Sequence, residues 1–229
     1  MRERPAGDDG LLLDFSSTDR PAWTAARVAD ALRHAAADGR VSLSDVVACA
    51  ETVLVEALPG TGLNELGVRR VVHDLLASTV PDNDEGSGSV RSAIVIPVRY
   101  DGADLSSAAD AAGCSTDRLV QAHTHLTWTV QFMGFAPGFG YLVPEDGSDP
   151  SLTAVFNGLP RREESRPRVP AGSVAVAAGY SAVYPRVSPG GWHLLGVTDA
   201  VLWDSTAAPP SVLSAGARVR FVRAEEVIG

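Results

Sequence analysis

The sequence predicts an α+β N-terminal domain of the order β-α-β-β-α, which we classify as ferredoxin-like, followed by a mainly β domain that forms a barrel. Three observations predict this fold. Residues 11–78 alternate strand-type and helix-type apolar patterns, and residues 79–92 are rich in glycine, serine and acidic residues. Residues 93–229 contain many short strands joined by glycine and proline loops, which is typical of a closed or nearly closed barrel. We therefore expect two domains, a linker at 79–92 and a disordered leader at 1–10.

The elements of the N-terminal domain follow from the spacing of its apolar residues. Leu11–Phe15 is a short apolar run that indicates a strand, and Ala22–Ala37 places its apolar residues on one helical face. Two β-type runs at Asp45–Ala50 and Val53–Leu58 indicate a hairpin, although the usual Asn-Gly turn is missing. Asn64–Leu76 has apolar residues at the i, i+3, i+4 and i+7 spacing of a second helix.

The C-terminal domain begins with one strand and two short helices and then continues as β structure. Ala93–Val98 is an apolar strand, Asp104 caps a helix that ends at Gly113, and Ser115 caps another that runs to about His123. Further strands are predicted at Thr127–Phe132, Val174–Ala178, His193–Val197, Val201–Trp203 and Arg218–Val222.

Composition excludes several classes of function. The formal charge of -9 disfavours nucleic acids and anionic membranes as partners. All nineteen basic residues are arginine, so this chain has no lysine for a Schiff base or a phosphate-binding P-loop. Cys49 and Cys114 are far apart and suggest neither a disulfide framework nor a zinc site. With no secretory h-region and no long apolar window, we expect a cytoplasmic protein.

The loop Gly134–Tyr141 is the first candidate for a ligand site. Its glycines, among them Gly138, let backbone N–H groups face outward, Pro137 stiffens it, and Phe135 and Phe139 provide aromatic walls. Such a loop suits a carboxylate or amide ligand. The alternative is a tight barrel corner whose aromatic residues fill the core.

An arginine cluster forms the second candidate. Four guanidinium groups fall within eight residues of an otherwise acidic chain, and their planar forked donors suit bidentate recognition of carboxylate or phosphate. Arg161 and Arg168 are the first choices, with Arg162 also at the site, while Glu163 and Glu164 offer the alternative of a neutralised, solvated loop. Further candidates for substrate binding come from the glycine-rich loops that follow: Ser173, Ser188, Gly190, Gly191 and Trp192.

His123 is the titratable imidazole closest in sequence to the first loop. It is a candidate general acid or base near neutral pH, and the alternative is a histidine buried in the core. His125 stands beside it, but no third ligand has the spacing of a metal site, so we expect no bound metal in this chain.

The chain resembles the B-subunit family of the prokaryotic 5-oxoprolinase, whose relatives include allophanate hydrolase subunit 1 domains and the sporulation kinase inhibitor KipI. Nine motifs, in family order, carry this resemblance over about residues 94–223: Val98–Tyr100 with Asp104–Leu105, His123–Thr124, Gly134–Leu142, Pro160–Arg162, Val169–Val174, Tyr184–Pro185, Ser188–Trp192, Gly196 with Thr198, and Arg218–Phe221. The segments 142–159 and 178–182 depart from the family pattern.

The resemblance implies a cyclophilin-like barrel, a stable pairing with a homologous C-type subunit, and cooperation with an A-type subunit. Together these open 5-oxoproline to glutamate with ATP, and with Mg²⁺ shared among the subunits, while this chain alone is inactive. In that reaction His123, Arg161 and Arg168 are the expected catalytic residues. Two other functions stay open, a kinase inhibitor that binds a sensor histidine kinase and an amidolyase-type component that acts on allophanate.

Overall fold

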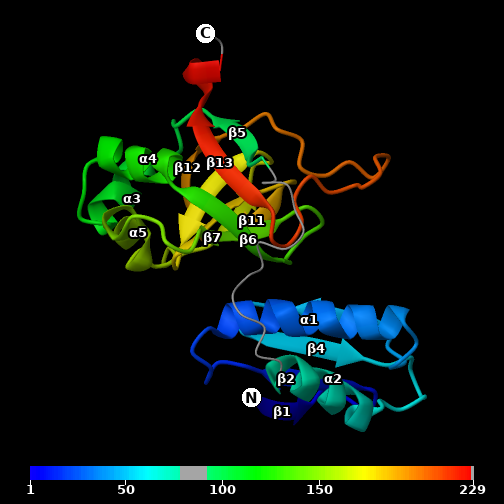
Figure 1. The fold of residues 1–229 in the computed structure, drawn as a ribbon. Helices are drawn as coiled ribbons and strands as arrows, with labels where there is room; N and C mark the ends of the chain where they lie inside the picture. Colours follow the sequence, from blue (N-terminus) through cyan, green and yellow to red (C-terminus); the bar gives the residue numbers. More distant parts are fainter. Residues whose placement is uncertain (78–91, 228–229) are drawn as a thin grey trace. The chain divides into compact units, whose positions relative to one another are not determined.

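The computed structural model describes residues 1–77 and 92–227, and the chain divides into two compact units, Met1–Ser89 and Val90–Gly229 (Figure 1). Each unit has its own hydrophobic core. Apart from Ser92, the predicted linker at 79–92 lies outside the described residues. Within the described parts of the chain, no helix is long and apolar enough to cross a membrane.

The N-terminal unit is a four-stranded antiparallel sheet with two helices packed into one core with it. The sheet order is β1-β2-β4-β3, and the elements along the chain are β1 (Arg2–Pro5), β2 (Gly10–Asp14), α1 (Pro21–Ala37), β3 (Asp45–Ala48), β4 (Thr52–Glu56) and α2 (Glu65–Ala77). Alternate residues of β2 and β4 are buried, as the period of a half-covered strand requires. Both predicted helices and the predicted hairpin are confirmed.

Two expectations for this unit need correction or stay unconfirmed. The expected disordered leader is wrong, because residues 2–5 form β1 and pair with β2 from Arg2 opposite Asp14 to Pro5 opposite Leu11. The ferredoxin-like description is not confirmed. Strands β2 and β3 are connected through α1 and lie on either side of β4. The fourth strand of the sheet is β1, which pairs with β2 and precedes it in the chain.

The C-terminal unit is built on a nearly closed seven-stranded sheet in the order β12-β9-β10-β7-β6-β13-β5. These strands are β5 (Ile94–Val98), β6 (Thr127–Met133), β7 (Gly140–Pro144), β9 (Ser173–Ala177), β10 (Tyr180–Val183), β12 (His193–Val197) and β13 (Arg218–Arg223). The two ends of the sheet meet at Arg99 and Val197, whose backbones exchange two hydrogen bonds of 2.9 Å. The predicted barrel character is therefore confirmed.

Three helices gather along one side of this sheet: α3 (Leu105–Ala111), α4 (Thr116–His125) and α5 (Pro150–Asn157) (Figure 1). Their apolar faces, with inward residues such as Trp128 and Phe221, form the main core. A two-stranded sheet pairs β8 (Arg166–Val169) with β11 (Ser188–Gly190), and the 3-10 helix η1 (Ala224–Val227) follows β13.

Not every expected element is present. Helix α5 lies in the region expected to be wholly β, and it occupies part of the 142–159 segment that departs from the family pattern. The predicted strand at Val201–Trp203 is wrong except for a single bridge between Trp203 and Ser211. Segment 178–182 contains the turn between β9 and β10, where Ala178 and Gly179 both have positive φ.

Candidate functional site

The loop Gly134–Tyr141 joins β6 to β7 and presents one aromatic ring to solvent. The Gly134 N–H donates to the Phe139 carbonyl at 3.1 Å, which closes the loop. Phe135 has φ +64° and is 56% exposed. A non-glycine residue in this region carries backbone strain of about 1 kcal/mol or more, and such strain gathers at functional sites. The surrounding loop therefore holds Phe135 in an exposed, costly position.

Behind Phe135 lies an aromatic cluster that is separate from the main core. Phe139 is its centre, with ring centroids 5.1 Å from Phe135, 5.1 Å from Tyr141, 5.3 Å from Tyr184 and 5.9 Å from Trp192. These rings meet edge to face, a favourable geometry for aromatic pairs. Phe139 and Trp192 are buried, so of the predicted aromatic walls Phe135 is the one that is mainly exposed.

Gly138 serves packing rather than an outward-facing amide. It has φ +79°, and a Cβ placed on it would lie 2.8 Å from the Cβ of Trp203. Pro137 beside it is exposed. The loop Gly134–Tyr141 is therefore a tight barrel corner, which was the alternative interpretation. It also supports the exposed ring of Phe135.

The arginine cluster is organised by a buried carboxylate, Asp104. Its Oδ1 accepts hydrogen bonds of 2.6 Å from both Arg162 Nη1 and Arg166 Nη2, and its Oδ2 accepts one of 2.9 Å from the backbone N–H of Leu194. Asp104 precedes α3 at the N-cap position, but its side chain makes no capping hydrogen bond. The carboxylate that we expected to cap a helix instead binds two arginines.

The electrostatics of this cluster favour an ionised Asp104. Burial raises the pKa of the carboxyl as the largest single effect. The hydrogen bonds from Arg166 and Leu194, with the fields of Arg166 and Arg162, together outweigh burial, so the pKa lies below its usual value. Two guanidinium groups thus share one carboxylate, and Arg162 Nε and Arg166 Nη1 are buried without a hydrogen-bond partner among the described residues. Such unpaired atoms are rare in proteins and cost stability.

Arg161 and Arg168 differ from their neighbours because both are exposed and neither forms a hydrogen bond or ion pair with another described residue. The Arg161 guanidinium lies beside the backbone of Gly191, since a Cβ at Gly191 would come within 3.7 Å of Arg161 Nη2 and 2.8 Å of Ser165 Oγ. Of the predicted arginines, these two are therefore available to meet a ligand. Arg162 is bound to Asp104 and so holds in place the loop 158–165 between α5 and β8, which we call the arginine loop.

Tyr184 connects the aromatic cluster to the arginine cluster. Its ring packs against Phe139, and the fields of Arg161 and Arg166 both act on its phenol. A side chain at Gly190 would collide with the Tyr184 hydroxyl, so the hydroxyl lies against the Gly190 backbone. The sequence pattern Tyr184–Pro185 marked this position as a motif but did not reveal that it joins the two clusters.

The remaining predicted binding residues form hydrogen bonds within the protein that hold the site together. Ser173 is buried in β9, and its carbonyl accepts the Tyr184 N–H at 2.9 Å. The Ser188 hydroxyl donates to the Arg186 carbonyl at 3.2 Å. The Gly191 carbonyl accepts from the Arg162 N–H at 2.8 Å, so the double glycine fixes the arginine loop.

His123 is in the core and not in this site. Its ring has no exposed surface, stacks on Phe221 at 4.3 Å, and hydrogen-bonds through Nδ1 to the Tyr100 hydroxyl and through Nε2 to Ser181 Oγ. Burial lowers the pKa of His123 to about 3. The structure gives no support to a general acid or base role, because a ligand in solvent does not reach this neutral imidazole.

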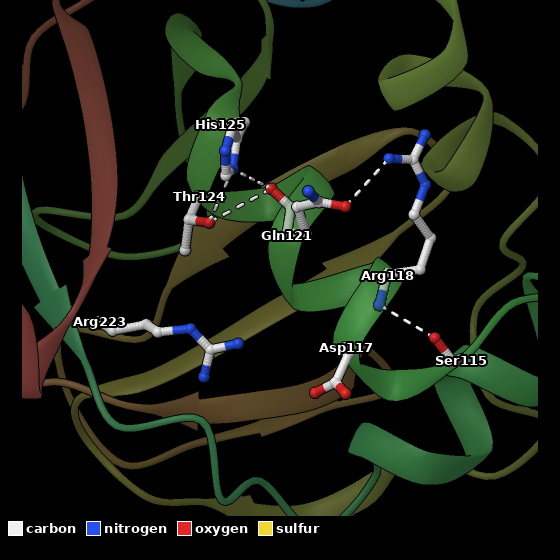
Figure 2. Close-up of a pocket in the computed structure, with 7 residues that line it drawn as sticks. All are labelled: Ser115, Asp117, Arg118, Gln121, Thr124, His125 and Arg223. Carbon is white, nitrogen blue, oxygen red and sulfur yellow. Dashed lines mark hydrogen bonds between the residues drawn. The ribbon is translucent and has the colours of Figure 1, made fainter.

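A polar hollow of about 440 Å³ lies along the outer face of α4 (Figure 2). Sequence patterns did not predict it. It is lined by Ser115, Asp117, Arg118, Gln121, Thr124, His125 and Arg223. Figure 2 shows the Arg118 guanidinium directed to the Gln121 side chain, where they form a hydrogen bond of 3.2 Å, while Thr124 and His125 bond to backbone carbonyls. Much of this lining is thus paired within the wall, and it shares no residue with the aromatic or arginine cluster.

The sequence of residues 1–213 matches the family described as carboxyltransferase domain, subdomain C and D. The chain belongs to this carboxyltransferase domain family. The resemblance to the 5-oxoprolinase B-subunit family is confirmed by relatives that carry this name. The Bacillus subtilis (strain 168) protein is 36% identical over 162 residues, which cover 69% of this chain and 62% of the relative. The Escherichia coli O157:H7 protein is 42% identical over 136 residues, 58% of this chain and 59% of the relative.

Solved structures show the same fold inside longer chains. The crystal structure of TTHA0988 superposes with a TM-score of 0.73 at 32% identity, over 94% of this chain and 39% of that chain. The K. lactis urea amidolyase has a TM-score of 0.69 at 18% identity, over 99% of this chain and 15% of that chain, and it shows likeness of fold alone. The chain also spans less than two thirds of the length of the two curated relatives.

Proposed function

We propose that this chain is the B-type subunit of a multi-subunit 5-oxoprolinase, which converts 5-oxoproline, ATP and water to glutamate, ADP and phosphate. The single observation that carries the proposal is the identity of 36% and 42% to two proteins named as the B subunits of 5-oxoprolinase. The site adds physical support. An exposed aromatic ring, available arginines and side-chain-free glycines are suited to a small planar carboxylate.

The proposed role of this chain is to bind and orient the lactam. Arg161 is the proposed partner of the ligand's anionic oxygen, because it is exposed, unpaired among the described residues and next to Gly191. Arg168 supplies a second available cation in strand β8, which follows the loop that carries Arg161. Arg162 and Arg166 are positioning residues, since Asp104 already holds them. Phe135 offers a flat apolar surface to the ring of the substrate.

The nucleotide fits this chain less well than the lactam does. Mg²⁺ binds to carboxylate oxygens and phosphates, but Asp104 is committed to two arginines, and no three His, Cys, Asp or Glu side chains converge in the part of the chain that the structure describes. When bound to the whole enzyme, ATP would supply the phosphoryl group that activates the lactam. We assign no step of that chemistry to residues of this chain and propose that partner subunits hold the nucleotide.

The proposed partners are a homologous C-type subunit and an A-type subunit. Support comes from the naming of the relatives as subunits and from the occurrence of this fold as 39% of the TTHA0988 chain. In the proposed assembly the aromatic and arginine clusters form one wall of a shared site. This explains why the chain is expected to be inactive alone.

Co-expression with candidate C-type and A-type subunits tests the proposal. The complex is expected to release ADP only when 5-oxoproline is present, and the isolated chain is expected to release none. An Arg161→Ala change should lower kcat/KM by about tenfold to a hundredfold, as expected for the loss of a charged contact to substrate. Arg220→Ala is the matched control, because Arg220 is an exposed arginine of β13 and should leave the rate unchanged. An assembled complex that turns over allophanate and not 5-oxoproline would contradict the proposal.

A further inference from the structure

Tyr184 is a buried phenol whose hydroxyl is not used by the fold. The residue is 2% exposed, yet its hydroxyl forms no hydrogen bond to another described residue. Among the described residues, the fully buried side-chain atoms without a hydrogen-bond partner do not include the Tyr184 hydroxyl oxygen. Because this oxygen has no partner, it must therefore retain a small area of contact with solvent. Buried hydroxyl groups are nearly always hydrogen-bonded. A hydroxyl that is held by a packed ring at the edge of solvent, with no acceptor among the described residues, is therefore available as a donor to a ligand.

The surroundings of the hydroxyl favour an anionic acceptor. Arg161 and Arg166 both place positive potential at the Tyr184 phenol. Burial, the largest effect, nevertheless raises the pKa of Tyr184, so the phenol keeps its proton at neutral pH and donates. Arg166 is held by Asp104, whereas no described residue holds Arg161 away from a ligand.

The absence of a side chain at Gly190 leaves room for the Tyr184 hydroxyl. A Cβ at this position would collide with the Tyr184 hydroxyl, and β11 pairs Gly190 with Arg166 across the two-stranded sheet. Gly191 next to it similarly leaves room beside Arg161. The two glycines therefore border the phenol and the Arg161 guanidinium without covering either with a side chain.

We infer that the Tyr184 hydroxyl and the Arg161 guanidinium together bind the carboxylate of a small ligand, which makes Tyr184 a specificity-determining residue. This inference rests on the proposed function for the choice of ligand, 5-oxoproline. A neutral O–H donor and a planar cation bind the two oxygens of one carboxylate. The ring of the ligand then lies toward the aromatic cluster around Phe139.

Calorimetric binding of 5-oxoproline to the full chain, alone and assembled with its C-type and A-type partners, tests the inference. Tyr184→Phe removes only the hydroxyl and should weaken binding by about tenfold, the effect of losing a hydrogen bond to a charged group. It should not lower the melting temperature, because that hydroxyl has no partner among the described residues. Tyr180→Phe is the matched control. Its hydroxyl donates to Gln131 Oε1 at 2.9 Å, so its loss should lower stability and leave binding unchanged.

Binding of the lactam 2-pyrrolidone, which lacks the carboxylate, tests whether the Tyr184 hydroxyl contacts the carboxylate of 5-oxoproline. The wild-type protein should bind 2-pyrrolidone much more weakly than 5-oxoproline. The Tyr184→Phe change should not lower the affinity for 2-pyrrolidone further. Equal affinity of wild type and Tyr184→Phe for 5-oxoproline overturns the inference while leaving the proposed function intact if the complex still turns over. Binding that needs Tyr184 in a complex without turnover contradicts the proposed function alone. No binding to wild type in either form overturns both.

Discussion

Replacing Asp104 by asparagine tests whether the buried carboxylate organises the arginine loop. The change keeps the size of the side chain and an oxygen for the Leu194 N–H, but removes the charge that Arg162 and Arg166 share. Removing one member of a buried charge pair costs about 3–5 kcal/mol. Because the arginine side chains retain 30% and 25% exposure, water takes over part of the lost interaction, and we expect about 2–3 kcal/mol.

Urea unfolding of wild type and Asp104→Asn at pH 7 measures this difference, and thermal melting should show a fall of roughly 8 °C. Asp101→Asn is the matched control. Asp101 pairs with Arg99 at 2.6 Å, but both side chains are more than half exposed, so the loss should stay below about 1 kcal/mol. If Asp104→Asn is no more destabilising than Asp101→Asn, Asp104 does not hold the arginine loop.

Three further predictions address the core histidine, the double glycine and the exposed phenylalanine. Because folded His123 has a pKa of about 3, well below the unfolded value, stability should be full above about pH 6.5 and fall by on the order of 2 kcal/mol from pH 7 to 5. Urea titrations should show this loss in His125→Gln but a flatter profile in His123→Gln. Gly190→Ala should destabilise by about 1–3 kcal/mol, since the new methyl group collides with the Tyr184 hydroxyl, and thermal melting measures it. Phe135→Gly should leave stability within about 1 kcal/mol, because relief of the positive φ offsets lost ring contacts, while calorimetry should show weaker 5-oxoproline binding.

Local patterns in the sequence predicted most helices and many strands. The i, i+3, i+4 spacing marked α1 and α2, and strict alternation marked β6. Strand β1 was missed because its sequence, Arg-Glu-Arg-Pro, has no apolar face and gains its structure only by pairing with β2. Helix α5 was missed because it is short and begins at the proline of a Gly-Ser-Asp-Pro stretch that is typical of a loop.

The site could be predicted only in outline. Motifs located the Gly134 loop and the arginine cluster, but the partner of Arg162 is 58 residues away and that of Arg166 is 62 residues away. No local pattern shows that Asp104 binds these two arginines and not Arg161. The same holds for His123, whose partner Ser181 is 58 residues distant and makes it a core residue. Long-range packing decides which polar side chains face a ligand.

The most direct test of the proposed function is 5-oxoproline-dependent ADP release by a complex purified with this chain as its B-type subunit. We predict release by the wild-type complex, none by this chain alone, and a tenfold or greater fall in kcat/KM in complexes carrying Arg161→Ala or Tyr184→Phe. An intact complex that releases no ADP with 5-oxoproline, or whose rate and KM are indifferent to both changes, would contradict the assignment of the substrate site to these residues.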